Sequence, residues 1–375
     1  MRPGTFQRRL LSLLTALTAA AIAAAGADAA EPTVYQLPDA THASSLAPGA
    51  DGSVWFAPSR GPEWAGPKGR MVGIVRADGK VGELAIPGFG HPVSGTAGEA
   101  WVSGEREDAA GGLVPLVGRL TADGQLENQH AVGRGGTRIG EMAIARGAVW
   151  FVRRSAGRRE TIARLSIADG AVRKFVLGKA CEVRAIAAAE NGALWFTETC
   201  RRHPPNREST EPWSAIGRID LGGRIARHRL GAKGIPLSIA VGQNGTVWFG
   251  ITHNGFSADL VGRITKAGAL AEYRIRGYPD SIAVGPGGRV WFASWLGRRH
   301  PALGSITQSG ERELACADPT CELEPTALAT APDGSLWYGL ARPNLNEGGG
   351  GSGIAINMEI ENEPGFVAHL PEPAS

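Results

Sequence analysis

The sequence is poor in helical signals and lacks the motifs of several large enzyme classes. It has no long stretch of helical periodicity, although it is 43% hydrophobic and carries 54 Gly and 24 Pro among 375 residues. It also has no Ser-His-Asp signature, no Gly-rich nucleotide loop and no metalloprotease helix. This composition favours a β protein with many turns.

A charge excess of one sign is missing as well. The formal net charge is +3, and it falls to +1 without the three Arg and one Asp of residues 1–29. A near-neutral protein offers no basic surface for a nucleic acid, and no base-stacking or phosphate-cradling motif is present. We therefore predict no nucleic-acid partner.

Residues 1–29 have the pattern of a secretory signal peptide. Arg2, Arg8 and Arg9 form a basic start, residues 10–25 are an apolar run, and small residues lead up to Ala29. This order predicts cleavage after about Ala29, a secreted or periplasmic protein, and no membrane span in the mature chain. A membrane anchor is the alternative interpretation, but the run is short and no basic stop follows it.

Tryptophan is concentrated in a recurring phrase, in which Trp mostly follows a small residue plus Val or Leu and precedes Phe, Tyr or Val. Successive copies are 46, 49, 45, 53, 43 and 46 residues apart. Seven of the ten tryptophans occupy this place: Trp55, Trp101, Trp150, Trp195, Trp248, Trp291 and Trp337. A period in this range indicates a radial or stacked array of repeats.

Each phrase is preceded by a turn pair, such as Asp51-Gly52 or Asn191-Gly192. These pairs tolerate the positive φ at both central positions that a two-residue hairpin requires, so we place each Trp on the second strand of a hairpin. Trp55 would then face one side of its strand, with Val54 and Phe56 on the other. Both sides are apolar and need cover, which neighbouring blades would provide.

Four strand signals recur in every repeat unit. We therefore predict an all-β fold, a seven-bladed β-propeller with four antiparallel strands per blade, as a single domain over residues 30–375. The blades are expected at about 43–88, 89–133, 134–179, 180–231, 232–277, 278–322 and 323–373. Residues 33–38 and 365–370 both have the pattern of a fourth strand. We expect the amino-terminal strand to complete blade seven, although an additional or displaced strand in that blade is the alternative.

The four cysteines fit an oxidising compartment. Cys181 and Cys200 lie almost symmetrically about the Asn191-Gly192 turn, and Cys316 and Cys321 bracket a short loop. We predict the disulfides Cys181–Cys200 and Cys316–Cys321, each stabilising by about 2–3 kcal/mol. A zinc site is the alternative, but the spacings are long and no His lies close by.

The repeat resembles that of the virginiamycin B lyase family, enzymes that open streptogramin antibiotics. That family repeats Asp-Gly-x-hydrophobic-Trp-Phe-Thr-Glu, then Ile-Gly-Arg-Ile, then a Gly turn and a closing strand ending in Pro. Here Trp195-Phe196-Thr197-Glu198 and Ile216-Gly217-Arg218-Ile219 match those phrases, and the resemblance covers about residues 33–373. The phrases encode strands and turns, so the resemblance implies the propeller architecture.

The resemblance also implies a site on one face of the ring, where magnesium, glutamates and histidines open the antibiotic's ester by elimination. The family's histidines lie in a Pro-His-x-Ile phrase at the first strand of the last two blades. Asp280 and Thr326 occupy those positions here. Glu324 matches a family Glu before the last Pro-His, whereas Ala341 stands where a further Glu is found.

Elimination needs a base near the proton and an acid for the leaving oxygen, and imidazole serves because its pKa lies near neutral pH. Thr326 cannot act as the base, and Asp280 can do so only with a raised pKa. Asp280 and Glu324 could hold magnesium from adjacent blades, so they are the candidate catalytic and metal-binding residues. The alternative is that both are hydrated polar residues at a channel mouth.

Long loops between second and third strands should gather on one face and make it locally basic, with exposed aromatic side chains. Such a face suits a small molecule, a glycan or a protein partner. The candidate ligand-binding residues are Arg184, Glu198, Arg201, Trp213, Trp295 and Arg298. The alternative is a solvated rim whose charges are partly offset by nearby carboxylates.

Two functional hypotheses follow. The first is an exported lyase-like propeller that binds a ligand or partner without the family's catalytic histidines. The second is a metal-dependent carbon-oxygen lyase or lactonase that acts on a cyclic ester through a rearranged site at Asp280 and Glu324. Magnesium is the cofactor that the family resemblance implies for the second hypothesis.

Overall fold

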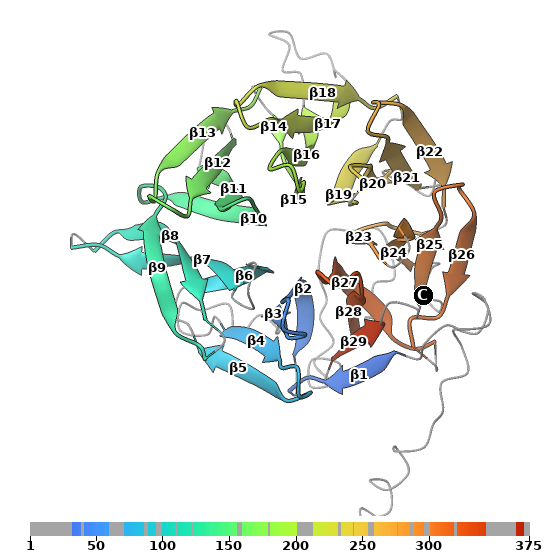
Figure 1. Ribbon diagram of the computed structural model, residues 1–375, viewed down its shortest axis with the longest axis horizontal. Helices are drawn as coiled ribbons and strands as arrows, with labels where there is room; N and C mark the ends of the chain where they lie inside the picture. The colour runs from blue at the N-terminus through green and yellow to red at the C-terminus, as the bar shows by residue number, and fades with distance from the viewer. Residues whose placement is uncertain are drawn as a thin grey trace, which may run out of the picture.

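The computed structural model shows seven small antiparallel sheets arranged around a central axis (Figure 1). The structure describes residues 32–38, 41–59, 71–85, 89–94, 100–109, 111–121, 123–155, 160–178, 181–200, 213–231, 234–242, 244–253, 259–275, 277–285, 288–295, 301–318, 321–342 and 365–370. The predicted fold, an all-β seven-bladed propeller with four antiparallel strands per blade, is confirmed. Within the described ranges, no helix is long and apolar enough to cross a membrane.

The strands follow one another from the axis outward in each blade. Blade one contains β2 (His42–Pro48), β3 (Val54–Ser59), β4 (Met71–Val75) and β5 (Val81–Ala85). Blade two contains β6 (Phe89–Ser94), β7 (Ala100–Glu107), β8 (Leu113–Leu120) and β9 (Leu126–Ala131). Blade three contains β10 (Thr137–Ala145), β11 (Ala148–Ser155), β12 (Thr161–Ser166) and β13 (Val172–Val176).

The inner strand of blade four is interrupted. Its two pieces, β14 (Cys181–Glu182) and β15 (Ile186–Ala188), both pair with β16 (Leu194–Cys200), which is followed by β17 (Trp213–Ile219) and β18 (Ile225–Arg229). Blade five contains β19 (Ile235–Val241), β20 (Val247–Thr252), β21 (Leu260–Ile264) and β22 (Leu270–Arg274). Blade six contains β23 (Ile282–Val284), β24 (Val290–Trp295), β25 (Pro301–Ile306) and β26 (Arg312–Ala315).

Blade seven joins the two ends of the chain. Its sheet order is β1 (Thr33–Gln36), β29 (Phe366–Leu370), β28 (Leu336–Ala341) and β27 (Glu324–Thr330). The register runs antiparallel from Thr33 opposite His369 to Gln36 opposite Phe366. The expectation that the amino-terminal strand completes the last blade is therefore confirmed, and hydrogen bonds between β1 and β29 close the ring.

The turn before the Trp strand differs from the predicted hairpin turn in blades one, four, five and seven. The glycine has a positive φ, for example 80° at Gly52 and 84° at Gly192, but Asp51 and Asn191 do not. Instead, the Asp or Asn side chain accepts a backbone N–H two residues on, as Asn191 does from Ala193 at 3.0 Å. In these four blades the expectation of positive φ at both positions was wrong, because this side-chain bond stabilises a longer turn that needs only one left-handed residue. In blade three, by contrast, Arg146 and Gly147 both have a positive φ, 46° and 66°, in a two-residue turn.

The Trp strands have two apolar faces because each blade is packed between two others. Trp55 is buried in a cluster with Val102 and Leu116 of blade two. Val54 and Phe56 instead pack with Trp337 and Val367 of blade seven. The predicted division of side chains between the two faces is confirmed, and the blade-to-blade contacts form the hydrophobic core.

In blades one, four, five and six, a glycine on the third strand makes room for the phenylalanine that follows the Trp. Phe196 lies opposite Gly217, and a Cβ at Gly217 would overlap the Phe196 ring. We expect Gly217→Ala to lower the free energy of unfolding by about 1–3 kcal/mol, because the rigid buried ring must shift. Urea denaturation measures this, with Gly118→Ala as control, since its nearest neighbour is the flexible end of Leu126 at 3.0 Å. Equal losses in the two variants would contradict the explanation.

Four of the indoles are also covered by a residue from the third strand. Trp150, Trp195 and Trp248 lie under the guanidinium groups of Arg164, Arg218 and Arg263. In blade seven, His369 stacks on Trp337 with ring centroids 4.3 Å apart. Desolvation by burial lowers the pKa of His369, although the charge of Asp333 opposes this.

This lowered pKa predicts a dependence of stability on pH. The unfolded chain binds the proton more readily than the folded chain, so the free energy of unfolding should fall as the pH drops below about 6.5. We expect His369→Arg, which places in blade seven the residue type of Arg164 and Arg218, to lessen that fall because Arg does not titrate there. Urea denaturation at pH 7 and pH 5 measures the difference, and an equal fall in both proteins would contradict it.

Candidate functional site

The inner strands share an irregularity near the end at which they start. The pairing register shifts between Ala43 and Ser45, Gly90 and Val93, Ile139 and Met142, Pro236 and Ser238, and Pro325 and Ala327. In blade four the inner strand breaks between β14 and β15, and in blade six β23 starts only at Ile282, three residues after Pro279. Proline lacks the N–H that a ladder requires, and a proline stands at the irregularity in blades two, five, six and seven.

The irregular segments of blade one and of blades three to seven surround a cavity of about 530 Å³ on the propeller axis. Bulges re-aim side chains that a regular strand would turn toward a neighbouring blade. Among the lining residues at the shifts are Ser44, Glu141, Arg184, Asp280 and Thr326, one from each of five blades. Figure 1 shows the inner strands around the axis. The volume lies in the range of small-molecule sites.

A group of four hydrogen bonds links blade three to the interrupted strand of blade four. Arg154 donates through Nη2 to the Val183 carbonyl at 2.7 Å and to Glu141 Oε2 at 2.7 Å. Arg154 Nε donates to Glu160 Oε1 at 2.9 Å, and Glu160 Oε2 accepts the Val183 N–H at 2.8 Å. We call these residues the Arg154 clasp. It supplies the hydrogen bonds that Val183 loses where the strand breaks, and so fixes the backbone that carries Arg184.

The clasp also pairs two charged side chains that line the cavity, Arg154 and Glu141. Desolvation by burial opposes the charged form of Arg154, but Glu141 and Glu160 outweigh it and raise the pKa of the guanidinium. By contrast, the only ion pair of Arg184 within the described part of the chain is a 3.5 Å contact with Glu182, and both side chains are about half exposed. Arg184 is therefore the lining cation that remains available to a ligand.

Asp280 lies directly before β23, between blades five and seven. Its side chain is open to the cavity solvent, yet the surrounding walls desolvate it. This desolvation, together with the negative charge of Asp259, raises the pKa of the Asp280 carboxyl. No hydrogen bond or ion pair to this carboxylate is present among the described residues.

The family assignment comes from the sequence. The profile of the virginiamycin B lyase family matches residues 115–347, well over half of the chain. The chain belongs to the virginiamycin B lyase family. No curated protein matches the chain.

Solved structures of several enzymes are similar to this member of the virginiamycin B lyase family. A mutant puromycin hydrolase has a TM-score of 0.58 and 18% identity, over 81% of this chain and 50% of that chain. A Pyrococcus horikoshii acylaminoacyl peptidase has a TM-score of 0.49 and 10% identity, over 68% and 42% of the two chains. A Xanthomonas campestris gluconolactonase has a TM-score of 0.44 and 16% identity, over 94% of each chain. This chain spans about half the length of the hydrolase, and at 18% identity the likeness to the hydrolase shows the fold alone.

The virginiamycin B lyase resemblance places two histidines at positions that line the cavity here. Asp280 and Thr326 occupy those positions and both border the cavity. Glu324, the position that agrees with the family, begins β27 opposite Ala341 and is not among the lining residues. The structure therefore brings Asp280, but not Glu324, to the cavity.

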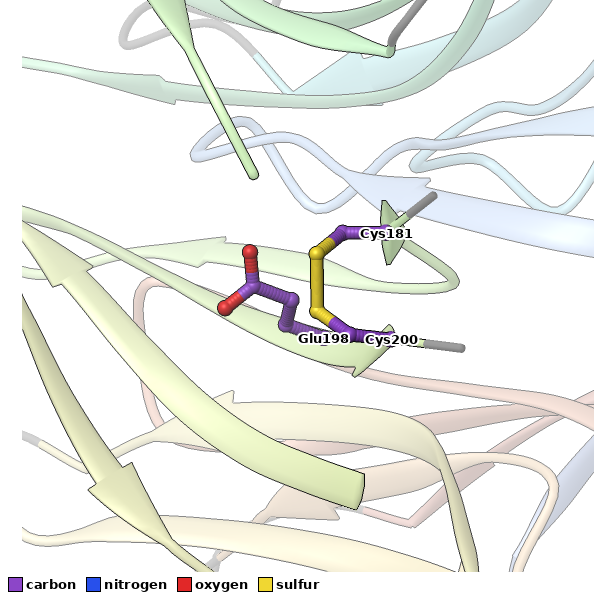
Figure 2. Close-up of side chains that lie close together, drawn as sticks. All are labelled: Cys181, Glu198 and Cys200. Atoms are coloured by element: carbon purple, nitrogen blue, oxygen red, sulfur yellow. A yellow bond between two sulfur atoms is a disulfide. The ribbon is translucent and has the colours of Figure 1, made fainter. Parts of the chain in front are cut away.

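The donors near Asp280 do not fit the magnesium ion that the family implies. Mg²⁺ is usually bound through one or two carboxylates and several waters in octahedral geometry. Glu141, the other lining carboxylate, already accepts from Arg154. Among the described residues, the one group of three His, Cys, Asp or Glu side chains close enough to share an ion is Cys181, Glu198 and Cys200. Figure 2 shows that its two sulfur atoms form a disulfide.

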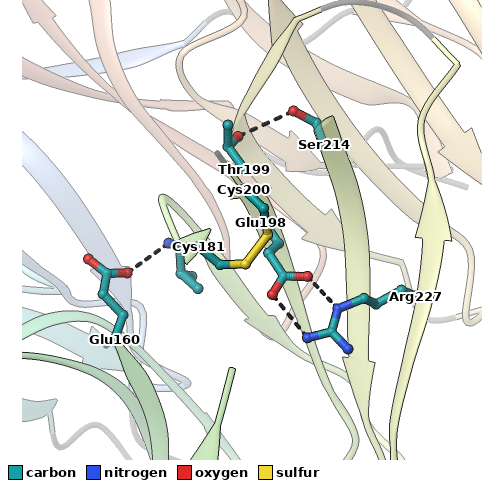
Figure 3. Close-up of a disulfide and its surroundings, with 8 residues drawn as sticks. Glu160, Cys181, Glu198, Thr199, Cys200, Ser214 and Arg227 are labelled. Carbon is teal, nitrogen blue, oxygen red and sulfur yellow. Dashed lines mark hydrogen bonds and ion pairs between the residues drawn. A yellow bond between two sulfur atoms is a disulfide. The ribbon is translucent and has the colours of Figure 1, made fainter. Parts of the chain in front are cut away.

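Glu198 lies in the interior rather than on a ligand-binding face. It is fully buried, and Arg227 donates to its carboxylate through Nε at 2.5 Å and Nη2 at 3.0 Å (Figure 3). The bidentate pair satisfies a charge that burial would otherwise penalise. Glu198 therefore has a structural role, as a ligand would have to displace Arg227 to reach it.

The other predicted ligand residues are dispersed. Trp213 begins β17 opposite Cys200 and lies under Arg229, 4.6 Å from the ring centroid. The backbone of Trp295 ends β24, and its side chain lies outside the described part of the structure. Arg201 and Arg298 also lie outside the described residues, as does the predicted signal peptide. Of the six, Arg184 is the one that the described structure places on the cavity.

Both predicted disulfides are present, and no cysteine is free. Cys181 and Cys200 are direct cross-strand partners, as their spacing about the turn predicted. The zinc alternative is wrong, because all four sulfur atoms are used in disulfides. The disulfides are consistent with an extracellular or periplasmic location.

Sequence reasoning assigned no role to Glu141, Glu160 or Ser238. The clasp joins residues 6 to 29 positions apart, and no local phrase marks such a contact. The available signal was proline near the start of an inner strand, as at Pro236 and Pro325, which indicates a bulge and hence a side chain turned toward the axis.

Proposed function

We propose that the protein is an exported propeller that binds a small polar organic molecule in the central cavity and leaves it chemically unchanged. The observation that carries this is the cavity itself, which is lined by the bulges of the inner strands and by polar groups from several blades. A rigid ring with convergent polar groups is a typical small-molecule site. Arg184 is proposed to contact an anionic or acceptor group of the ligand.

The part of the proposal that the ligand is left unchanged rests on the residues that occupy the family's catalytic positions in this chain. Thr326 cannot serve as a base, and its hydroxyl already donates to the Ala43 carbonyl at 2.6 Å. Glu141 is held by the Arg154 clasp, and Glu324 does not line the cavity. No described group is placed to perform both the base and acid roles that elimination requires.

A second candidate is a lyase or lactonase in which Asp280 is the general base. It is favoured by the position of Asp280, where the family has a histidine, and by the raised pKa of its carboxyl. A base with a pKa nearer the working pH is more effective. The donors described here support no magnesium-dependent form of this reaction.

The two candidates differ in what happens to the ligand. The disulfide-intact protein would be titrated calorimetrically with streptogramin B, lactones and glycans, with and without Mg²⁺, and the recovered compound analysed by mass spectrometry. We expect binding that Arg184→Met weakens about tenfold, because a charge-assisted hydrogen bond is lost. Arg274→Met, at an exposed arginine on the outer strand β22, should bind as the wild type does.

Each outcome decides between the candidates. Recovery of unchanged ligand supports the binding protein. Recovery of an opened ester, with turnover lost in Asp280→Asn, supports the enzyme. Binding that Arg184→Met and Arg274→Met weaken equally would place the ligand outside the cavity and contradict the proposal.

A further inference from the structure

The wall of the cavity around Asp280 mainly offers hydrogen-bond acceptors. On one side, Ser238 Oγ donates its proton to the Pro279 carbonyl at 2.6 Å. On the other side, Thr326 Oγ1 donates its proton to the Ala43 carbonyl at 2.6 Å. A hydroxyl has one proton and two lone pairs, so the capacity left on both groups is to accept. We call Asp280, Ser238 and Thr326 the acceptor wall.

Two further hydroxyls line the cavity. Ser281 Oγ accepts the Leu328 N–H at 2.8 Å, and Ser45 Oγ is buried without a hydrogen-bond partner in the described structure. Neither hydroxyl is hydrogen-bonded to the Asp280 carboxylate among the described residues, and a hydroxyl carries no charge, so neither offsets the negative charge of that carboxylate.

No cation in the described structure offsets that charge. Arg154 is engaged by the clasp through Nε and Nη2, and its charge is paired with Glu141 and Glu160. Arg184 lies on blade four, separated from Asp280 by the Leu237 segment of blade five, and it pairs with Glu182. Asp259, which is 6% exposed, adds a further negative charge and accepts the His253 N–H at 3.0 Å. An unpaired carboxylate beside a second one is unfavourable until a cation arrives.

We propose that the acceptor wall binds a protonated primary amine of the ligand. An alkylammonium carries three donors and no acceptor, which matches one carboxylate and two hydroxyls with free lone pairs. This inference rests on the proposed binding function and names the chemical class of the ligand, an organic amine whose ammonium group lies against Asp280. A neutral alcohol supplies a donor but leaves the carboxylate charge unpaired.

The test uses compounds that differ only at the nitrogen. Glucosamine, glucose and N-acetylglucosamine form one set, and phenethylamine and 2-phenylethanol form another, each titrated at pH 7 into the disulfide-intact protein. We expect at least one amine to bind about tenfold or more tightly than its neutral partner, because its hydrogen bonds are charge-assisted. Asp280→Asn should reduce that ratio to about one.

Glu182→Gln is the matched control, since it removes a carboxylate that is half exposed and not among the cavity-lining residues. The amine preference should persist in this variant. Thermal unfolding reports on folding, and Asp280→Asn should melt no lower than the wild type because it removes a charge that has no partner.

Three results would overturn the inference. They are an absence of amine preference in both sets, a preference that survives Asp280→Asn, and binding of Mg²⁺ or Ca²⁺ alone that Asp280→Asn abolishes. If neutral compounds bind through Arg184 without an amine preference, the proposed binding function stands while this inference fails.

Discussion

Replacing Arg227 with methionine should lower the free energy of unfolding by about 3–5 kcal/mol, because Glu198 would remain as a buried charge without a partner. Glu198 is completely buried, and Arg227 makes both of its ion-pair hydrogen bonds. Urea denaturation at pH 7 measures the loss.

Two further variants separate the charge effect from packing. The double variant Glu198→Gln with Arg227→Met should regain part of the loss, since no buried charge remains. Lys80→Met breaks the exposed pair with Asp78, whose side chains are 81% and 51% exposed, and should change stability by less than about 1 kcal/mol. A loss of similar size for Lys80→Met and Arg227→Met would contradict the assignment.

Replacing Arg154 with methionine should open the clasp and free the backbone between β14 and β15. Three acceptors lose their donor: Glu141, Glu160 and the Val183 carbonyl. We expect a loss of about 1–3 kcal/mol in the free energy of unfolding, as buried polar groups are left unsatisfied. Hydrogen exchange at the Val183 amide, which donates to Glu160, should become faster.

The matched control for the clasp is Arg173→Met. Arg173 also connects blade three to blade four, by donating to the Gly222 carbonyl at 2.8 Å, but it does so on an exposed part of the blades. This variant should leave exchange at Val183 unchanged. Unaltered exchange at Val183 in Arg154→Met would show that the disulfide Cys181–Cys200 alone holds this segment, and the clasp would lose its proposed role.

The clasp and the disulfide act on opposite ends of the same short segment. Cys181–Cys200 ties β14 to β16, and the Arg154 clasp holds Val183 from blade three. Arg184 follows at once and lines the cavity. The interruption of the inner strand thus turns a cation toward the axis without leaving the backbone unpaired.

The candidate site has Asp280 and Thr326 at the two positions where the family resemblance implies histidines. The bulge in β27 and the late start of β23 place Thr326 and Asp280 at the cavity. When the backbone at such a position stays the same and only the side chain changes, the ligand that the site binds can change while the propeller scaffold does not. The acceptor wall is one such change, because Thr326 has used its proton and Asp280 has no cation partner in the described structure.

The sequence by itself determined the blade repeat, because each blade depends on contacts between residues close in the chain. The Trp phrase, the Asx-Gly turn and the third-strand glycine opposite Phe196 are all local signals. Cys181 and Cys200 were paired correctly for the same reason, since one hairpin places them opposite each other.

Only the tertiary structure decided which polar side chains face the axis and which are buried. Glu198 looked available at a strand end, but Arg227, 29 residues later, folds back over it. Glu324 and Asp280 looked equivalent, yet only Asp280 lines the cavity, because the bulge in β27 turns Thr326 toward the axis instead. A shift of one residue in a strand exchanges the two faces of that strand. The Arg154 clasp likewise depends on contacts between neighbouring blades. Which polar side chains reach the cavity is therefore decided by three-dimensional packing, and no short sequence motif indicates it.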